Sequence, residues 1–487
     1  MRLAPLLLAL LVSLPAAAQQ PTRIPQAALD TAVQLRETAL ADDTGWQITE
    51  SLTTEVGPRV AGSEADARAV AWAKAKFEEL GFDRVWTEPV TFPKWERRGQ
   101  SAEVLGPHSQ KLVVIALGGS PGGTVEGQVV RFPDLASLEA AAPGSLKGRI
   151  AFVDYRMERA RDGHGYGPAS RIRGTGPSAA IRAGAAAYVM RSAGTDSHRV
   201  AHTGGTRFAE GLTPIPSAAL SNPDADQLAR LVALDPSTRI RVSLDCGWDG
   251  EYTSQNVIGE ITGASRPDEV VLIAGHLDSW DVGTGAIDDA AGIGITMAAA
   301  KLIAALPQRP ARSIRVVAFA NEEQGLHGGF AYAKAHADEL VKHAILAESD
   351  FGAGRIYGFD AGVADHAKDA IKQIHGVLEP LGIEWMPGEG SAESDIIPFT
   401  RAGASWAWLG HDGTGYFDLH HTEDDTLDKI DPKALAQNVA AYAVFTYLAA
   451  SAEGDFGSSP ERAVTTSGWY SRRSRKLWTQ IKSDKSG

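Results

Sequence analysis

The sequence predicts an α/β protein with a mixed, mainly parallel sheet and a smaller module inserted into it. In the second half of the chain, short apolar runs such as residues 269–275 and 313–320 alternate with helical stretches. This alternation is typical of parallel strands that helices cover on both faces. Between residues 106 and 250 the pattern changes to short β-rich runs with Gly/Pro turns, which is typical of a compact module inserted at a surface loop.

Length and composition narrow the class of protein. At 487 residues the chain is too long for one ordinary core, and 44% hydrophobic with 22% charged residues is the composition of a soluble globular protein. The net charge of −13 argues against nucleic acid and anionic membranes as partners. After the N-terminal segment, no stretch approaches the ~20 consecutive apolar residues of a membrane span. The single cysteine, Cys246, excludes an internal disulfide and is expected to be buried.

The N-terminal 18 residues are predicted to be a signal peptide. Arg2 precedes an apolar run at 6–14, and small residues at 16–18 follow it. This order is that of an export signal cleaved after Ala18, whereas a buried core helix would not require it. We therefore expect a periplasmic or extracellular protein.

Residues 27–42 and 64–80 have the spacing of amphipathic helices, and Asp431 and Pro432 begin a closing helix over 431–453. The basic, aromatic C-terminus is expected to be a solvated tail. The predicted organisation is a signal peptide at 1–18, a main domain in two parts at 19–105 and 251–455, an inserted module at 106–250, and a tail at 456–487.

Acidic residues and histidines follow four of the predicted strands, at the point where each strand ends. They are His276, Asp278, Asp281, Asp288 and Asp289; Glu322 and Glu323; Asp350; and His420, His421, Asp424 and Asp425. Ligands of such sheets bind beyond the carboxyl ends of the strands, so we expect these side chains to share one pocket.

Histidine and carboxylate ligands suit zinc, and a pair of zinc ions ~3.5–4 Å apart needs a carboxylate that reaches both. A further, unligated glutamate would take a proton from water. Glu322 and Glu323 supply one group for each of these roles, and their spacing leaves open which is which. We therefore expect a metal-dependent hydrolase.

A dinucleotide-binding loop is the rival interpretation, because Gly283 and Gly285 precede a helix and Glu322 ends the next strand. Three features disfavour it. Asp288 stands where the fingerprint has its third glycine, seven residues separate the glycines from the strand, and the acids of the loop would repel a pyrophosphate.

Four stretches, at 275–292, 321–325, 348–352 and 417–426, together resemble the co-catalytic di-zinc exopeptidases of the aminopeptidase type, in particular their carboxypeptidase Q-like branch. The resemblance extends to about residue 453. It implies a phosphorylase/hydrolase-like zinc exopeptidase domain, identifies the inserted module as a protease-associated domain, and implies two zinc ions and peptide substrates.

The resemblance also implies a role for each site residue. Asp288 would bridge the two ions, and Glu322 would be the general base. The remaining ligands would be His276, Glu323, Asp350 and His421. Asp278 would fix the imidazole of His276, and the peptide bond between Asp288 and Asp289 would be cis. No role follows for Asp281 or Asp289.

For three further residues, the sequence leaves open whether the role is functional or structural. His420 stands where many relatives have tyrosine, and it would either donate to the oxyanion or only pack. Ser394 and Asp395 lie in a stretch, 388–399, that resembles the family's substrate-side loop, but either could instead cap a helix. The histidines of the inserted module, His202 among them, are expected to be surface or structural residues.

The predicted function is that of a secreted zinc metallo-exopeptidase acting on short peptides or dipeptides, in which Glu322 takes a proton from the attacking water and returns it to the leaving amine. One alternative is an N-terminal aminopeptidase on longer peptides. The other is a non-catalytic zinc-containing binding protein, which the full ligand set disfavours. The terminus that is read and the oligomeric state, a homodimer included, stay open.

Overall fold

The computed structural model describes residues 20–459, so the predicted signal peptide and residues 460–487 of the predicted tail lie outside it. Its strands join in one sheet in the order β13-β12-β14-β11-β9-β10-β8-β4-β5-β6-β7-β3, and β1 pairs with β8 and β2. The strands are β1 Arg84–Leu105, β2 Gln110–Leu112, β3 Val114–Ala116, β4 Gly123–Phe132, β5 Ile150–Val153, β6 Ala187–Arg191, β7 Ser217–Leu220, β8 Arg239–Ile261, β9 Arg266–His276, β10 Arg312–Phe319, β11 His343–Glu348, β12 Ile356–Gly362, β13 Glu384–Trp385 and β14 Trp406–His411.

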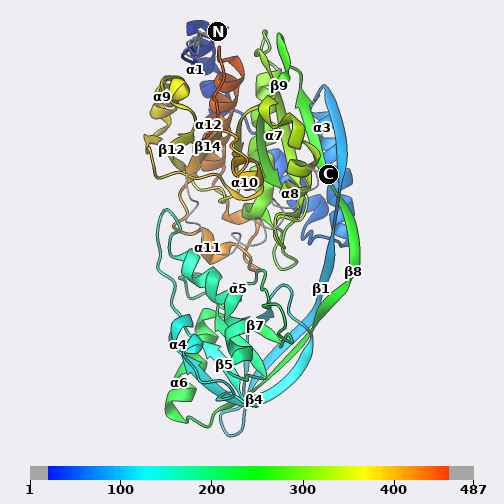
Figure 1. Cartoon of the computed structure of the whole chain (residues 1–487), viewed down its shortest axis with the longest axis vertical. Coiled ribbons are helices and arrows are strands. Elements are labelled where there is room, and N and C mark those ends of the chain that lie inside the picture. Colours follow the sequence, from blue (N-terminus) through cyan, green and yellow to red (C-terminus); the bar gives the residue numbers. More distant parts are fainter. Residues whose placement is uncertain (1–19, 460–487) are drawn as a thin grey trace, which may run out of the picture.

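Helices accompany these strands in both parts of the molecule (Figure 1). They are α1 Gln26–Leu40, α2 Thr44–Ser51, α3 Glu64–Glu79, α4 Leu135–Glu139, α5 Tyr166–Arg182, α6 Asn222–Leu234, α7 Ala291–Ala304, α8 His327–Ala335, α9 Lys368–Leu378, α10 Ile397–Thr400, α11 Tyr416–Leu419 and α12 Pro432–Ser451. Asp431 caps α12 by accepting from the backbone N–H of Lys433, as the sequence predicts. Among the described residues, no helix is long and apolar enough to cross a membrane.

The main part of the sheet is mixed and mainly parallel, as predicted. β9 lies parallel to both β10 and β11, β11 lies parallel to β14, and the antiparallel partners β8 and β12 flank this group. Side chains of β9 alternate between two cores: Val271 and Ile273 face the layer with α7 and α12, whereas Leu272 and Ala274 face the layer with α8 and α10. Burial on both faces explains why these strands are continuous apolar runs.

Close approach of α2 and α7 requires glycine in α7. A Cβ on Gly294 would lie 2.3 Å from Thr49 Oγ1 and 2.6 Å from the carbonyl oxygen of Gly45. The two helices therefore approach each other closely at this position, where α7 has no room for a side chain.

We expect Gly294→Ala to destabilise the protein by about 1–3 kcal/mol, because the added methyl group overpacks this contact. Gly376→Ala is the matched control: it also lies within a helix, α9, but its Cβ would meet nothing within 4 Å. That change should raise stability by about 0.5–1 kcal/mol. Thermal unfolding midpoints of the two variants should move in opposite directions, and a neutral Gly294→Ala would contradict the packing argument.

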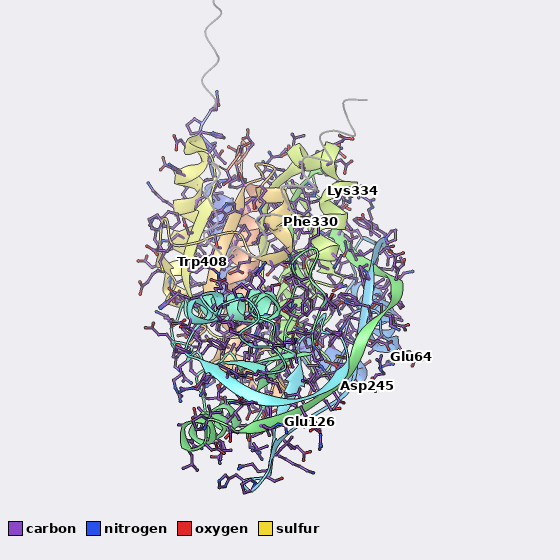
Figure 2. The ribbon with its side chains drawn as sticks, turned by 60° about the horizontal axis from the view of Figure 1, so that its bottom comes forward. Glu64, Glu126, Asp245, Phe330, Lys334 and Trp408 are labelled. Atoms are coloured by element: carbon purple, nitrogen blue, oxygen red, sulfur yellow. The ribbon has the colours of Figure 1, made fainter. Side chains whose placement is uncertain are left out.

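Residues between β1 and β8 form a second unit with cores of its own. Strands β3–β7 and helices α4–α6, together with parts of β1 and β8, enclose two apolar clusters that are separate from the core around α7 and α12. The antiparallel pair of β1 and β8 runs along the side of the molecule and connects this unit to the main part (Figures 1 and 2). The predicted limit at 105/106 coincides with the end of β1, whereas the limit at 250/251 falls inside β8.

Candidate metal centre and active site

Loops after four strands bring the predicted ligands to one place. His276 ends β9, Asp288 lies in the short helical turn Ala286–Ala290 before α7, and Asp350 follows β11. Glu323 follows β10, and His421 follows α11. The peptide bond between Asp288 and Asp289 is cis.

Asp288 is shared by two groups of ligand atoms. Its Oδ1 lies 3.0 Å from His276 Nε2, which lies 3.3 Å from Asp350 Oδ1. Its Oδ2 lies 3.2 Å from His421 Nε2, which lies 2.8 Å from Glu323 Oε2. One carboxylate thus presents a different oxygen to each of two His/acid pairs.

These separations fit tetrahedral metal coordination. Ligand atoms 2.0–2.1 Å from a zinc ion stand about 3.3 Å apart at the corners of a tetrahedron. The four distances lie near that value, and each group offers one imidazole nitrogen and two carboxylate oxygens. Asp288 Oδ2 and Glu323 Oε1 are also buried without a hydrogen-bond partner among residues 20–459. Because a buried carboxylate oxygen without a partner is costly, a cation is the fitting partner for both.

Glu322 belongs to neither ligand group, although it lines a cavity that Asp288, Glu323 and Asp350 also line. Its backbone N–H donates to Asp278 Oδ1 over 2.9 Å, and that of Glu323 donates to Asp278 Oδ2 over 3.4 Å. Burial and the carboxylate of Asp350 raise the pKa of Glu322 well above its ordinary value, against the charge of His276. Asp278 therefore holds the backbone of both glutamates.

The predicted contact between Asp278 and His276 takes a different form. His276 Nδ1 lies 3.1 Å from the backbone carbonyl of Asp278 and 3.6 Å from its carboxylate. The carbonyl can accept from Nδ1–H and so direct Nε2 to the metal group. Residue 278 orients the imidazole mainly through its main chain.

Comparisons with known proteins agree with this arrangement. The model of peptidase family M28 matches residues 256–446. Human carboxypeptidase Q is 32% identical over 402 residues, which cover 82% of this chain and 84% of that protein, and the bovine protein is 33% identical over 407 residues. The chain belongs to peptidase family M28. This M28 peptidase is therefore a metallopeptidase similar to carboxypeptidase Q.

Two solved structures share the fold. The peptidase M28 precursor of Shewanella amazonensis SB2B superposes with a TM-score of 0.87 at 50% identity, covering 90% of this chain and 99% of that one. The zinc aminopeptidase of Bacillus subtilis superposes with a TM-score of 0.59 at 20% identity, covering 82% and 94%.

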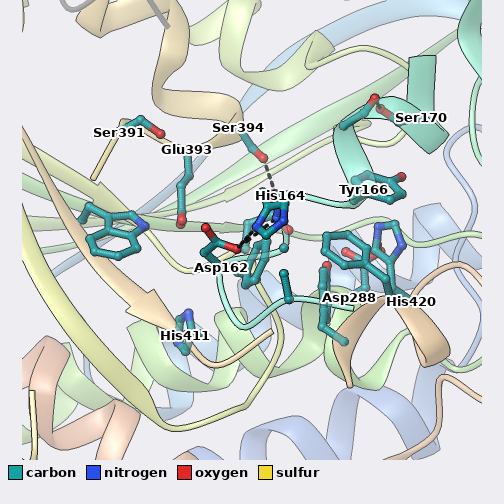
Figure 3. A pocket seen from close by; sticks show the side chains of 18 of the residues that line it. Asp162, His164, Tyr166, Ser170, Asp288, Ser391, Glu393, Ser394, His411 and His420 are labelled. Atoms are coloured by element: carbon teal, nitrogen blue, oxygen red, sulfur yellow. Dashed lines mark hydrogen bonds and ion pairs between the residues drawn. The ribbon is translucent and has the colours of Figure 1, made fainter. Parts of the chain in front are cut away.

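A cavity of about 920 Å³ lies over four of the candidate metal ligands of this M28 peptidase, Asp288, Glu323, Asp350 and His421. The inserted unit forms one wall with Tyr166 and Ser170 of α5, and Glu393 and Ser391 lie across the cavity from Asp288 and His420 (Figure 3). The site is thus a pocket between the two parts of the chain.

The two predicted pocket residues occupy different places. Ser394 lines the cavity and its hydroxyl donates to Asp350 Oδ2, so it holds a candidate metal ligand. Asp395 is fully buried behind the cavity, where its Oδ1 accepts from the backbone N–H of Gly329 over 2.9 Å. Only Ser394 is placed to meet a substrate.

His420 is held by a residue that sequence reasoning assigned to the surface or to structure. His202, from the inserted unit, is buried, and its Nε2 lies 2.9 Å from His420 Nδ1. The rings of His420 and His421 are stacked 3.4 Å apart, and His420 Nε2 lies 3.5 Å from Asp288 Oδ2. His420 therefore faces the metal group with its ring fixed from the insert.

The two acids without a predicted role have structural partners. Asp289 is fully buried and accepts from the backbone N–H groups of His276 and Gly292, each over 3.0 Å, which joins the end of β9 to the start of α7. Asp281 forms an ion pair with Arg97 of strand β1. Both fix the loop that carries Asp288.

Proposed function

We propose that this M28 peptidase is an exported zinc exopeptidase that hydrolyses short peptides, dipeptides in particular. The observation that carries the proposal is the position of Asp288, whose two oxygens face two separate ligand pairs. Two ions held there, one by His276 and Asp350 and the other by Glu323 and His421, would form a co-catalytic pair.

Zinc at such a site polarises the peptide carbonyl and lowers the pKa of water. The other steps belong to the side chains of the cavity. A carboxylate oxygen of Glu322 takes the proton of the attacking water and returns it to the leaving amine nitrogen, since Glu322 lines the cavity without being a ligand. His420 contacts the oxygen of the attacked carbonyl, and the insert holds its ring for that contact through His202.

The volume of the cavity and the helix that closes one side of it support a small substrate. The cavity volume of about 920 Å³ lies in the range of small-molecule sites, and α5 closes one side. Similarity to carboxypeptidase Q supports the same assignment. A long peptide read from its N-terminus is the second candidate, favoured only by the fold shared with the Bacillus aminopeptidase.

Export and the identity of the insert complete the proposal. Residues 1–18 have the order of a signal peptide, and removal of that segment would release the enzyme outside the cytoplasm. The unit between β1 and β8 is proposed to be a protease-associated domain, because it interrupts the peptidase domain and lines its cavity.

Zinc content and substrate size test the proposal together. The purified chain lacking residues 1–18 should bind two zinc ions and cleave dipeptides, lose activity on chelation, and regain it when zinc is restored. A panel of dipeptides and longer peptides, with either terminus blocked, distinguishes the candidates by kcat/KM. Faster cleavage of long peptides blocked at the C-terminus would favour the aminopeptidase, and two bound zinc ions without turnover would favour a binding protein.

A further inference from the structure

A second cavity, of about 330 Å³, adjoins the cavity over the metal ligands, and the proposed function does not use it. It is lined by Phe208 of the inserted unit, Trp248 of β8, Trp280 of the loop after β9 and Gln324 of the loop after β10. Gly205 lines both cavities, so the two are neighbours. The volume lies at the lower end of the range for small-molecule sites.

Three polar atoms of this lining are buried without a hydrogen-bond partner among residues 20–459. They are Oε1 and Nε2 of Gln324 and Nε1 of Trp280. Trp280 is only 3% exposed, so bulk water does not satisfy its N–H. Buried polar groups in proteins are normally paired, and an unpaired one is unfavourable. The lining therefore keeps an amide oxygen, an amide nitrogen and an indole N–H for a partner that the protein does not supply.

The same lining offers aromatic surface. Trp248 is 58% exposed, although tryptophan is highly buried on average. Phe208 and Trp280 add two further rings to the cavity. Aromatic rings stack on one another or pack edge to face, so a planar apolar group fits such a lining. The cavity thus combines aromatic surface with an unpaired amide.

The charged residues of the lining do not favour a charged ligand. Arg207 and His327 also line the cavity, but both have interactions of their own. The ring of His327, for example, lies 5.6 Å from that of Phe92. No acidic side chain of residues 20–459 lines the cavity. The groups that lack a partner are all neutral, which favours a neutral ligand.

We propose that this second cavity binds a small neutral amide with an aromatic body. A carboxamide carries a donor and an acceptor side by side, so it can pair with both amide atoms of Gln324, and its oxygen can also accept from Trp280 Nε1–H. The aromatic body then lies against Trp248 and Phe208. This binding site is separate from the one in which the peptide bond is cleaved.

Benzamide is the probe, because it joins one carboxamide to one ring. The chain lacking residues 1–18, with zinc present, should bind benzamide in isothermal titration with a Kd of about 1 mM or tighter, which is within reach of so small a ligand. Benzoate has the same ring but no N–H donor, so it should bind at least about 10-fold more weakly. Equal or tighter binding of benzoate would make the cavity an anion site and overturn the proposal. Absence of benzamide binding would overturn it too, since the polar atoms would then be satisfied by water alone.

Two variants place the bound benzamide in this cavity. Gln324→Met removes both unpaired amide atoms at nearly constant side-chain length and should weaken benzamide binding at least about 10-fold. It should not lower the thermal midpoint, because no side-chain hydrogen bond within the protein is lost. Trp248→Ala, at an exposed position, should weaken binding about 5-fold or more. Gln34→Met, the same substitution at an exposed position of α1, is the matched control and should match wild type.

Binding of benzamide in the cavity over the metal ligands would give a different result. Gln324→Met and Trp248→Ala would then bind benzamide as wild type does, and benzamide would compete with the best dipeptide substrate; either result overturns the proposal. If Gln324→Met does not fold, Trp248→Ala decides. The titrations measure binding and not turnover, so they test this site even if the proposed peptidase function fails.

Discussion

Glu322→Gln is expected to lower kcat by about 10²- to 10⁴-fold while both metal ions stay bound. Glutamine keeps the size of the side chain but cannot take a proton from water. Glu322 lies outside both ligand groups, so its replacement leaves both groups intact. Turnover on the best dipeptide and zinc content by elemental analysis are the measurements.

The neighbouring residue supplies the matched comparison. Glu323 Oε2 lies 2.8 Å from His421 Nε2 within a ligand group, so Glu323→Gln should lower zinc content as well as activity. Both variants replace a carboxylate by an amide of nearly the same size, and they do so at adjacent positions. Loss of metal in Glu322→Gln, or turnover within a few-fold of wild type with metal retained, would refute the assigned roles.

Predictability differed between the two halves of the active site. The metal side follows from local signals, because Glu322 and Asp350 directly follow apolar strands and parallel strands end at one sheet edge. Even there, only the family resemblance assigned different roles to Glu322 and Glu323. Their geometry now distinguishes them, since only Glu323 faces an imidazole of a ligand pair.

The insert side of the site was missed. His202 lies 218 residues from His420 in the sequence, and the contact depends on how the insert docks over the metal centre. Tyr166 and Ser170 follow an ordinary helical spacing that nothing local distinguishes from a solvated face. The position of the insert over the site depends on strands β1 and β8, and neither strand is a continuous apolar run. The sequence therefore contains no local indication that the insert contacts the metal side of the site.

Asp289 shows a second limit of sequence reasoning. Its role is to accept backbone N–H groups from both β9 and α7, which depends on the turn geometry rather than on residue type or spacing. Aspartates 288 and 289 look equivalent in the sequence, but the turn directs one to the metal groups and the other to the main chain. The number of acidic residues in a loop therefore does not distinguish those that face the metal groups from those that hold the backbone.

Asp288→Asn should remove most activity, about 10³-fold or more, together with at least one of the two metal ions. The carboxylate is the only group common to both ligand sets, and an amide offers one oxygen in place of two. Since metal polarisation of the carbonyl contributes several kcal/mol to transition-state stabilisation, its loss accounts for a reduction of this size. Zinc stoichiometry and kcat on the same dipeptide give the result directly.

Stabilisation of the folded protein by added zinc provides a second, independent measurement of the effect of Asp288→Asn. Zinc that binds only the folded chain should stabilise the wild-type protein by about 4 kcal/mol at 1,000 times the dissociation constant, so the thermal midpoint should rise when zinc is added. That rise should shrink in Asp288→Asn. Asp424→Asn is the control, since Asp424 lies three residues after His421 but outside both ligand groups, paired with His198 at 3.1 Å. If Asp288→Asn kept two zinc ions and the full midpoint shift, the two ions would not share this carboxylate, and the co-catalytic arrangement would be wrong.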